Sequence, residues 1–178
     1  MTKKISTNTM TDEELDKLFC MNGKKYGVKK LLLKAVAITE SSLDEHAYRF
    51  EPNFYDKYLK NKPEWAGKDP SEISASYGLM QLMYTTAWGL GFRGPGEDLY
   101  NPVYNVELGA KLLRTLLKAC PDLTGMQLWP IEVALARYNG GSYLNPGPDG
   151  KLRNQKYVDR VFSNWSDLKK AEKECDDE

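Results

Sequence analysis

The sequence reads VKKLLLKAVAITES over residues 28–41, and this stretch decides the fold class. Its apolar residues recur at helical spacing and predict a helix with one buried stripe, formed by Val28, Leu31, Leu32, Ala35, Val36 and Thr39. Glu40 lies one turn after Val36, on the rim of that stripe and near the end of the helix. Apolar surroundings and the negative end of the helix dipole both raise the pKa of a carboxyl group placed there. Glu40 therefore has the position of a general acid. The alternative is an ordinary last-turn glutamate in water.

The helical period continues on both sides of this stretch. The remaining predicted helices are one opened by the capping box Thr11-Asp12-Glu13-Glu14, a short one opened by Pro52, one over residues 76–88, a long one from Asn101-Pro102 to about Cys120, one opened by Pro130, and a last one over residues 154–162. No convincing set of alternating strands occurs. The predicted class is therefore mainly α, with little or no β structure; a small hairpin between residues 60 and 76 stays open.

Composition narrows the function classes. A chain of 178 residues fits one domain, and 41% hydrophobic residues supply a core. Lys+Arg and Asp+Glu are both 25, without a basic block, which argues against a nucleic-acid partner. A single histidine argues against a multi-histidine metal site, so neither a metal nor another cofactor is expected. No apolar run is long enough to span a bilayer.

The three cysteines are Cys20, Cys120 and Cys175, which are far apart and lack a CxxC spacing. Reduced thiols are the simpler expectation, and a bridge between Cys20 and Cys175 stays open. Residues 1–10 are polar and lack the apolar region of a signal peptide.

Two further motifs offer polar groups near predicted helix ends. Gly78-Leu79-Met80-Gln81 places a glycine at a predicted helix start, where a ligand or a second helix can approach the backbone. Tyr138-Asn139 precedes Gly140-Gly141, so Asn139 is either a helix cap or part of a cleft. Tyr157 is a mid-helix aromatic residue, for which core packing is the alternative to a functional hydroxyl.

Taken together, these motifs resemble the soluble-type (SLT) lytic transglycosylase domain, which shares the goose-type lysozyme fold. The resemblance rests on Glu40-Ser41, Gly78 to Gln81, Ala136 to Gly141 and Tyr157-Val158 in that order, and covers roughly residues 28–165. It implies a helical lysozyme-like domain over 28–165, preceded by an accessory helix in 1–27 and followed by a charged tail in 166–178. Residues 42–76 are longer than in compact members of the family, and their 48–55 segment looks like the variant of phage-like members.

The resemblance also implies the site and its chemistry. Glu40 is the expected acid and base, and the residues expected to line a glycan cleft are Ser41, Ser76 (or Ser74 in its place), Gly78, Met80, Gln81, Tyr138 and Asn139. Tyr157 is expected to place its hydroxyl near Glu40 or the sugar. The implied partner is a peptidoglycan strand, cleaved between N-acetylmuramic acid and N-acetylglucosamine to leave a 1,6-anhydro product. The expected place of action is the periplasm or cell wall, reached by phage delivery, by release at lysis or after removal of a signal. A monomer is favoured, although the oligomeric state is open.

Two other readings compete with this one. A goose-type hydrolase would need a second carboxylate to hold water, for which Asp44, Glu45 and Glu51 are nearby in sequence. A non-catalytic peptidoglycan-binding module of a virion is the other, and the retained Glu40 argues against it.

Overall fold

The computed structural model describes residues 9–119, 129–141 and 151–172. The elements in chain order are α1 (Asp12–Tyr26), α2 (Lys30–Ser41), β1 (Tyr48–Phe50), α3 (Pro52–Phe54), η1 (Tyr55–Leu59), η2 (Pro63–Trp65), α4 (Pro70–Ile73), β2 (Ala75–Tyr77), β3 (Leu82–Met83), α5 (Tyr84–Gly89), η3 (Gly96–Tyr100), α6 (Pro102–Lys118), α7 (Pro130–Gly140) and α8 (Gln155–Ala171). The predicted mainly α class is confirmed.

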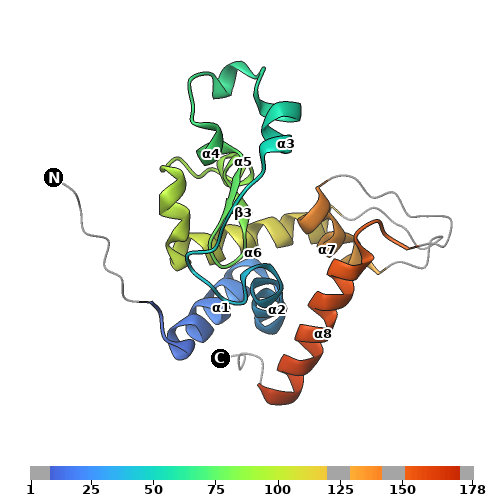
Figure 1. Ribbon diagram of the computed structural model, residues 1–178. Helices are drawn as coiled ribbons and strands as arrows, with labels where there is room; N and C mark the ends of the chain where they lie inside the picture. The colour runs from blue at the N-terminus through green and yellow to red at the C-terminus, as the bar shows by residue number, and fades with distance from the viewer. Residues whose placement is uncertain (1–8, 120–128, 142–150, 173–178) are drawn as a thin grey trace.

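Five helices, α1, α2, α6, α7 and α8, form what we call the helical lobe (Figure 1). Helix α2 packs against both α1 and α8 and is buried over most of its circumference. Phe19 of α1, Leu33 of α2 and Val161 of α8 are fully buried in one shared core. Because α2 lies inside this core, its last turn carries Glu40 from the interior of the lobe toward its surface.

The helix ends follow their sequence signals. Thr11 and Glu14 form the predicted capping box of α1, and the Asn101 side chain caps α6 by accepting from the Val103 N–H. Pro130 stands in the first turn of α7, as expected. Helix α8 continues to Ala171, beyond the predicted end at residue 162, so the first part of the predicted charged tail is helical.

Residues 48–100 form a second lobe, which we call the β lobe; it stands above α6 in Figure 1. Its centre is an antiparallel sheet in the order β1-β2-β3, with Arg49 opposite Ser76 and Ser76 opposite Met83. The hairpin left open between residues 60 and 76 is not formed there, because the strands lie at 48–50, 75–77 and 82–83. The helix expected over 76–88 is wrong: two strands and a turn precede α5.

Aromatic side chains give the β lobe a core of its own. Tyr77, Tyr84 and Leu99 are buried in it, and Trp65 packs edge-on against Tyr84 and Trp88. This core explains why short strands persist here, since two- or three-residue strands need packing on one face to be stable.

Two further expectations concern the chain as a whole. Cys20 is disulfide-bonded, so the expectation of reduced thiols is wrong; Cys120 and Cys175 lie outside the described residues. In the part of the chain that the structure describes, no helix has the length and apolar character needed to cross a membrane. The division into accessory helix, domain and tail stays a prediction, although α1 contributes Leu15, Leu18 and Phe19 to the main core.

Candidate active site

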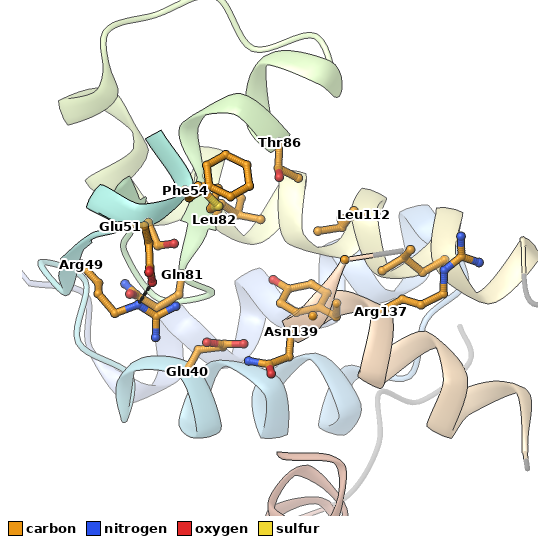
Figure 2. Close-up of a pocket in the computed structure, with 16 residues that line it drawn as sticks. Glu40, Arg49, Glu51, Phe54, Gln81, Leu82, Thr86, Leu112, Arg137 and Asn139 are labelled. Carbon is orange, nitrogen blue, oxygen red and sulfur yellow. Dashed lines mark ion pairs between the residues drawn. The ribbon is translucent and has the colours of Figure 1, made fainter. Parts of the chain in front are cut away.

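A cleft of about 630 Å³ lies between the two lobes. Its lining residues from the helical lobe are Glu40, Leu112, Leu116, Arg137, Tyr138, Asn139, Gly140 and Gly141, and those from the β lobe are Arg49, Glu51, Phe54, Ser76, Gln81, Leu82, Met83 and Thr86. Figure 2 shows Glu40 rising from α2 on one side, with Phe54, Leu82 and Thr86 on the other. The cleft therefore presents a carboxyl group on one wall to a mixed apolar and polar wall.

Glu40 has the environment predicted for an acid. Its side chain is partly buried, and this loss of hydration raises the pKa of the carboxyl group above its ordinary value. A hydrogen bond from Tyr157 and the positive charges of Arg49 and Arg160 oppose the rise without cancelling it. Burial thus favours the protonated form, while the opposing groups keep the carboxylate accessible once the proton has left.

Tyr157 approaches Glu40 from behind the cleft. Its hydroxyl donates a hydrogen bond to Glu40 Oε1 at 2.7 Å, from the first turn of α8. The tyrosine is 4% exposed, and burial together with the Glu40 charge raises its pKa far above the usual range. The phenol therefore stays protonated and acts as a fixed donor that orients one carboxyl oxygen of Glu40.

The predicted motif Gly78 to Gln81 forms the turn between β2 and β3, and the motif Tyr138-Asn139 lies in α7. A hydrogen bond between Tyr138 and Met80 joins the two. Asn105 of α6 is fully buried, donates to the Tyr77 and Leu99 carbonyls, and accepts from the Met80 N–H at 2.8 Å. The Ser41 hydroxyl donates to the Leu79 carbonyl, and the Tyr138 hydroxyl donates to the Met80 carbonyl. We call this hydrogen-bonded unit, residues 78–81 with Ser41, Asn105 and Tyr138, the turn network. It ties α2, α6 and α7 to the β lobe.

Several residues expected to contact a glycan serve the turn network instead. Ser41 bonds backbone carbonyls, and the side chain of Met80 is fully buried against Gly109. Gly78 was predicted to lie at a helix start, but the structure places it in the turn between β2 and β3, with φ at +69°. A Cβ there would lie 2.6 Å from Asn105 Nδ2 of α6 and 2.7 Å from the Leu99 carbonyl oxygen of η3, so the glycine admits these two elements rather than a ligand.

Four other predicted residues do reach the cleft: Ser76, Gln81, Tyr138 and Asn139. Gln81 holds a left-handed backbone, with φ at +45°, and its amide donates to the Ala47 and Gly78 carbonyls. Such a conformation is uncommon outside glycine and occurs preferentially at functional sites. Asn139 is not the helix cap, because Gly141 ends α7. Ser74 donates to the Glu51 carbonyl and is not part of the described cleft lining, whereas Ser76 is.

Of the three carboxylates considered for a hydrolase, Asp44, Glu45 and Glu51, only Glu51 lines the described cleft. Glu45 is buried and accepts from the Met10 N–H, whereas Asp44 accepts from the His46 N–H two residues away. Glu51 lines the cleft and pairs with Arg49, Nε to Oε1, at 2.5 Å. Glu51 is thus the carboxylate that shares the cleft with Glu40.

Sequence reasoning missed most of the β-lobe wall, including Arg49, Phe54 and Thr86. A signal existed in Tyr48-Arg49-Phe50-Glu51, where alternation places the charged residues on one face and the aromatic ones on the other. The register confirms the face, since Arg49, Ser76 and Met83 form a cross-strand row along the cleft. Among the described residues, no group of His, Cys, Asp and Glu lies close enough to hold a metal ion.

A helical lobe that presents a partly buried acid across a cleft to a small sheet defines a lysozyme-like fold. The model of the transglycosylase SLT domain matches residues 17–155, and the chain belongs to this family. Family membership makes it a protein of the lytic transglycosylase type, directed at the peptidoglycan of the cell wall. A comparison with curated proteins found no match.

Proposed function

We propose that the protein cleaves the β-1,4 bond between N-acetylmuramic acid and N-acetylglucosamine with Glu40 as its single acid and base. One observation carries this proposal: Glu40 lines the cleft with a raised pKa and is held by Tyr157 at 2.7 Å. A carboxyl group whose pKa is raised by burial holds its proton to a higher pH than a solvated one, and protonation of a glycosidic oxygen requires such an acid.

The proposed reaction conserves every atom within the strand. Glu40 donates its proton to the glycosidic oxygen, and the bond from that oxygen to C1 of the muramic sugar breaks through an oxocarbenium-like state. The acetamido group of the same sugar assists. Glu40, now a carboxylate, accepts the proton of the C6 hydroxyl as that oxygen bonds to C1. The product is a 1,6-anhydro sugar, and the proton returns to Glu40 without consumption of water.

Two features support a single-carboxylate reaction. Tyr157 donates to one oxygen of Glu40, Oε1, and no other residue competes in the described hydrogen bonds for Oε2 of this cleft-lining side chain. Glu51, the other carboxylate of the described cleft lining, is already paired with Arg49 through Oε1. The enzyme therefore needs Glu40 to act twice, first as the acid and then as the base.

A second candidate, a lysozyme-like hydrolase, is favoured by the presence of Glu51 in the same cleft. In that reaction Glu51 would hold a water molecule on the far side of the sugar, at the separation of about 6.5–9.5 Å that inverting enzymes use. The two candidates differ in product, because the hydrolase adds water and leaves a reducing end.

Mass spectrometry of soluble products from purified peptidoglycan tests the proposal. We expect muropeptides one water lighter than reducing-end products, resistant to borohydride, and absent when Glu40→Gln replaces the protein. Borohydride-reducible products would favour the hydrolase. The lack of any Glu40-dependent product, with the variant folded, would contradict both enzymes and favour a peptidoglycan-binding module.

A further inference from the structure

The charges lining the cleft favour an anion once Glu40 is protonated. Glu51 is then the remaining carboxylate of the described lining, against the guanidinium groups of Arg49 and Arg137. Arg137 donates from Nη1 to the Ala119 carbonyl at 3.0 Å, so part of its donor set is used within the helical lobe. Arg49 lies at the other end of the cleft, beside Gln81 and Glu51 (Figure 2).

Arg49 is held in a way that leaves it available to a ligand. Its side chain is 60% exposed, and it contacts Glu51 through Nε. A guanidinium group carries five N–H donors in a flat fork, so a single Nε contact leaves most of that fork for another planar acceptor. Exposed ion pairs contribute little stability, which means that a carboxylate on a ligand can share or replace Glu51 at small cost.

The sheet register fixes where Arg49 points. Arg49 pairs with Ser76, and Ser76 pairs with Met83, so the three side chains project from the same face of the sheet into the cleft. Tyr48 lies on the opposite face and packs edge-on against Tyr77. The backbone therefore sends the Arg49 side chain out on the cleft face of the sheet.

Arg49 is also within electrostatic reach of Glu40, since its charge lowers the pKa of that carboxyl group. A ligand carboxylate seated on Arg49 would offset this charge. The protonated form of Glu40 would then be favoured when such a ligand is present and less so in the empty cleft. Binding at Arg49 and readiness of the acid are thereby coupled.

We propose that Arg49 binds a carboxylate group of the peptidoglycan strand and makes the cleft selective for strands that carry it. This inference rests on the proposed function. The carboxylate has two sources on such a strand: the lactyl group of a muramic sugar without a peptide, or the acidic residues of an attached peptide. A planar bidentate pair with guanidinium is the same chemistry in both cases.

The test measures binding in the Glu40→Gln background, where turnover does not consume the strand. Cosedimentation compares Arg49→Gln, Arg49→Lys and the parent on purified peptidoglycan and on the same material whose carboxylates have been converted to amides. We expect Arg49→Gln to weaken binding to native strands about tenfold or more, as the loss of a charge-assisted contact predicts, with Arg49→Lys intermediate. On amidated strands the three proteins should bind alike. Arg93→Gln, which alters an arginine that stacks on Trp88 outside the cleft lining, is the matched control.

Strands stripped of peptide by an amidase separate the two sources. A tenfold effect confined to stripped strands assigns the lactyl carboxylate, and one confined to peptide-bearing strands assigns the peptide. An equal loss on carboxylate-bearing and amidated strands, or no loss on either native or stripped strands, would overturn the proposal. Because binding is scored without turnover, a failure to find Glu40-dependent products would contradict the proposed function without changing this result.

Discussion

The two walls of the cleft are held by different kinds of contact. On the helical side, Glu40 and Tyr138 each take part in a hydrogen bond at 2.7 or 2.9 Å to a partner on another element. On the β side, Arg49 and Glu51 are exposed by 60% and 36% and pair with each other. The wall carrying the proposed chemistry is thus fixed by hydrogen bonds between elements, whereas the opposite wall carries an exposed ion pair within the β lobe.

The strongest way to break this comparison is Gly78→Ala, because Gly78 joins the two walls. The new Cβ would lie 2.6 Å from Asn105 Nδ2 and 2.7 Å from the Leu99 carbonyl, at a φ of +69°. Overpacking and the left-handed backbone together should lower the free energy of unfolding by about 3 kcal/mol, as measured in urea. Gly67→Ala is the control: φ is +75° with nothing within 4 Å, and the expected loss is about 1 kcal/mol. Similar losses at both glycines would mean that packing in the turn network contributes little.

Tyr157→Phe tests whether the helical wall orients the acid. Removing the hydroxyl leaves the ring packed and removes the hydrogen bond to Glu40, so release of muropeptides should fall roughly 10- to 100-fold. Because that bond lowers the pKa of Glu40, its loss should also move the alkaline limb of the pH–rate profile to higher pH.

Stability should change much less in this variant, by about 1 kcal/mol, the usual value of one hydrogen bond. If the loss of product release were no larger than the loss of folded protein explains, Tyr157 would be assigned to core packing instead.

A smaller effect is expected in the pH dependence of stability. Burial raises the pKa of Glu40 in the folded protein, so the ionised form costs stability above that pKa, and the cost disappears as the pH falls through it. Glu40→Gln should therefore melt at a higher temperature than the parent near pH 8, with a difference that shrinks towards about pH 4. Asp56→Asn, which changes an exposed carboxylate of the β lobe, should show no such trend. A constant difference across the pH range would contradict a raised pKa.

The smallest effect is expected for Glu51→Gln, which tests the ion pair on the β side of the cleft. Glu51→Gln removes one partner of an exposed pair, so stability should change by less than about 1 kcal/mol and product release by no more than about threefold. The same variant separates the two candidate enzymes, since a hydrolase that used Glu51 to activate water would lose most of its activity. Denaturant unfolding and the product assay measure the two quantities.

Sequence reasoning succeeded where the signal was local. The period of α2 predicted that Glu40 lies in the last turn of a buried helix, and the caps at Thr11 and Asn101 predicted two helix starts. It failed between residues 75 and 83, because a short apolar run such as Leu79 to Met83 has no period that separates a helix from a strand.

The sequence indicated which residues lie near the site, but not what their side chains contact. Ser41, Gly78 and Met80 were expected at the cleft, and the structure places them in the turn network behind it. Asn105 of α6 organises this turn by bonding Met80 and Tyr77, which are 25 and 28 positions away, a separation that no local pattern encodes. Arg49 and Glu51 required the sheet register, which depends on strands of two or three residues.

The turn network has a consequence for the thermodynamics of binding. Asn105 uses both donor hydrogens and its acceptor oxygen within the protein, and its bonds tie the floor of the cleft to α6 before any strand arrives. A cleft built in this way is preorganised, so little ordering entropy has to be lost by the protein when a ligand binds. The entropy cost of association then falls mainly on the glycan, whose linkages must settle into a shape that the protein already holds.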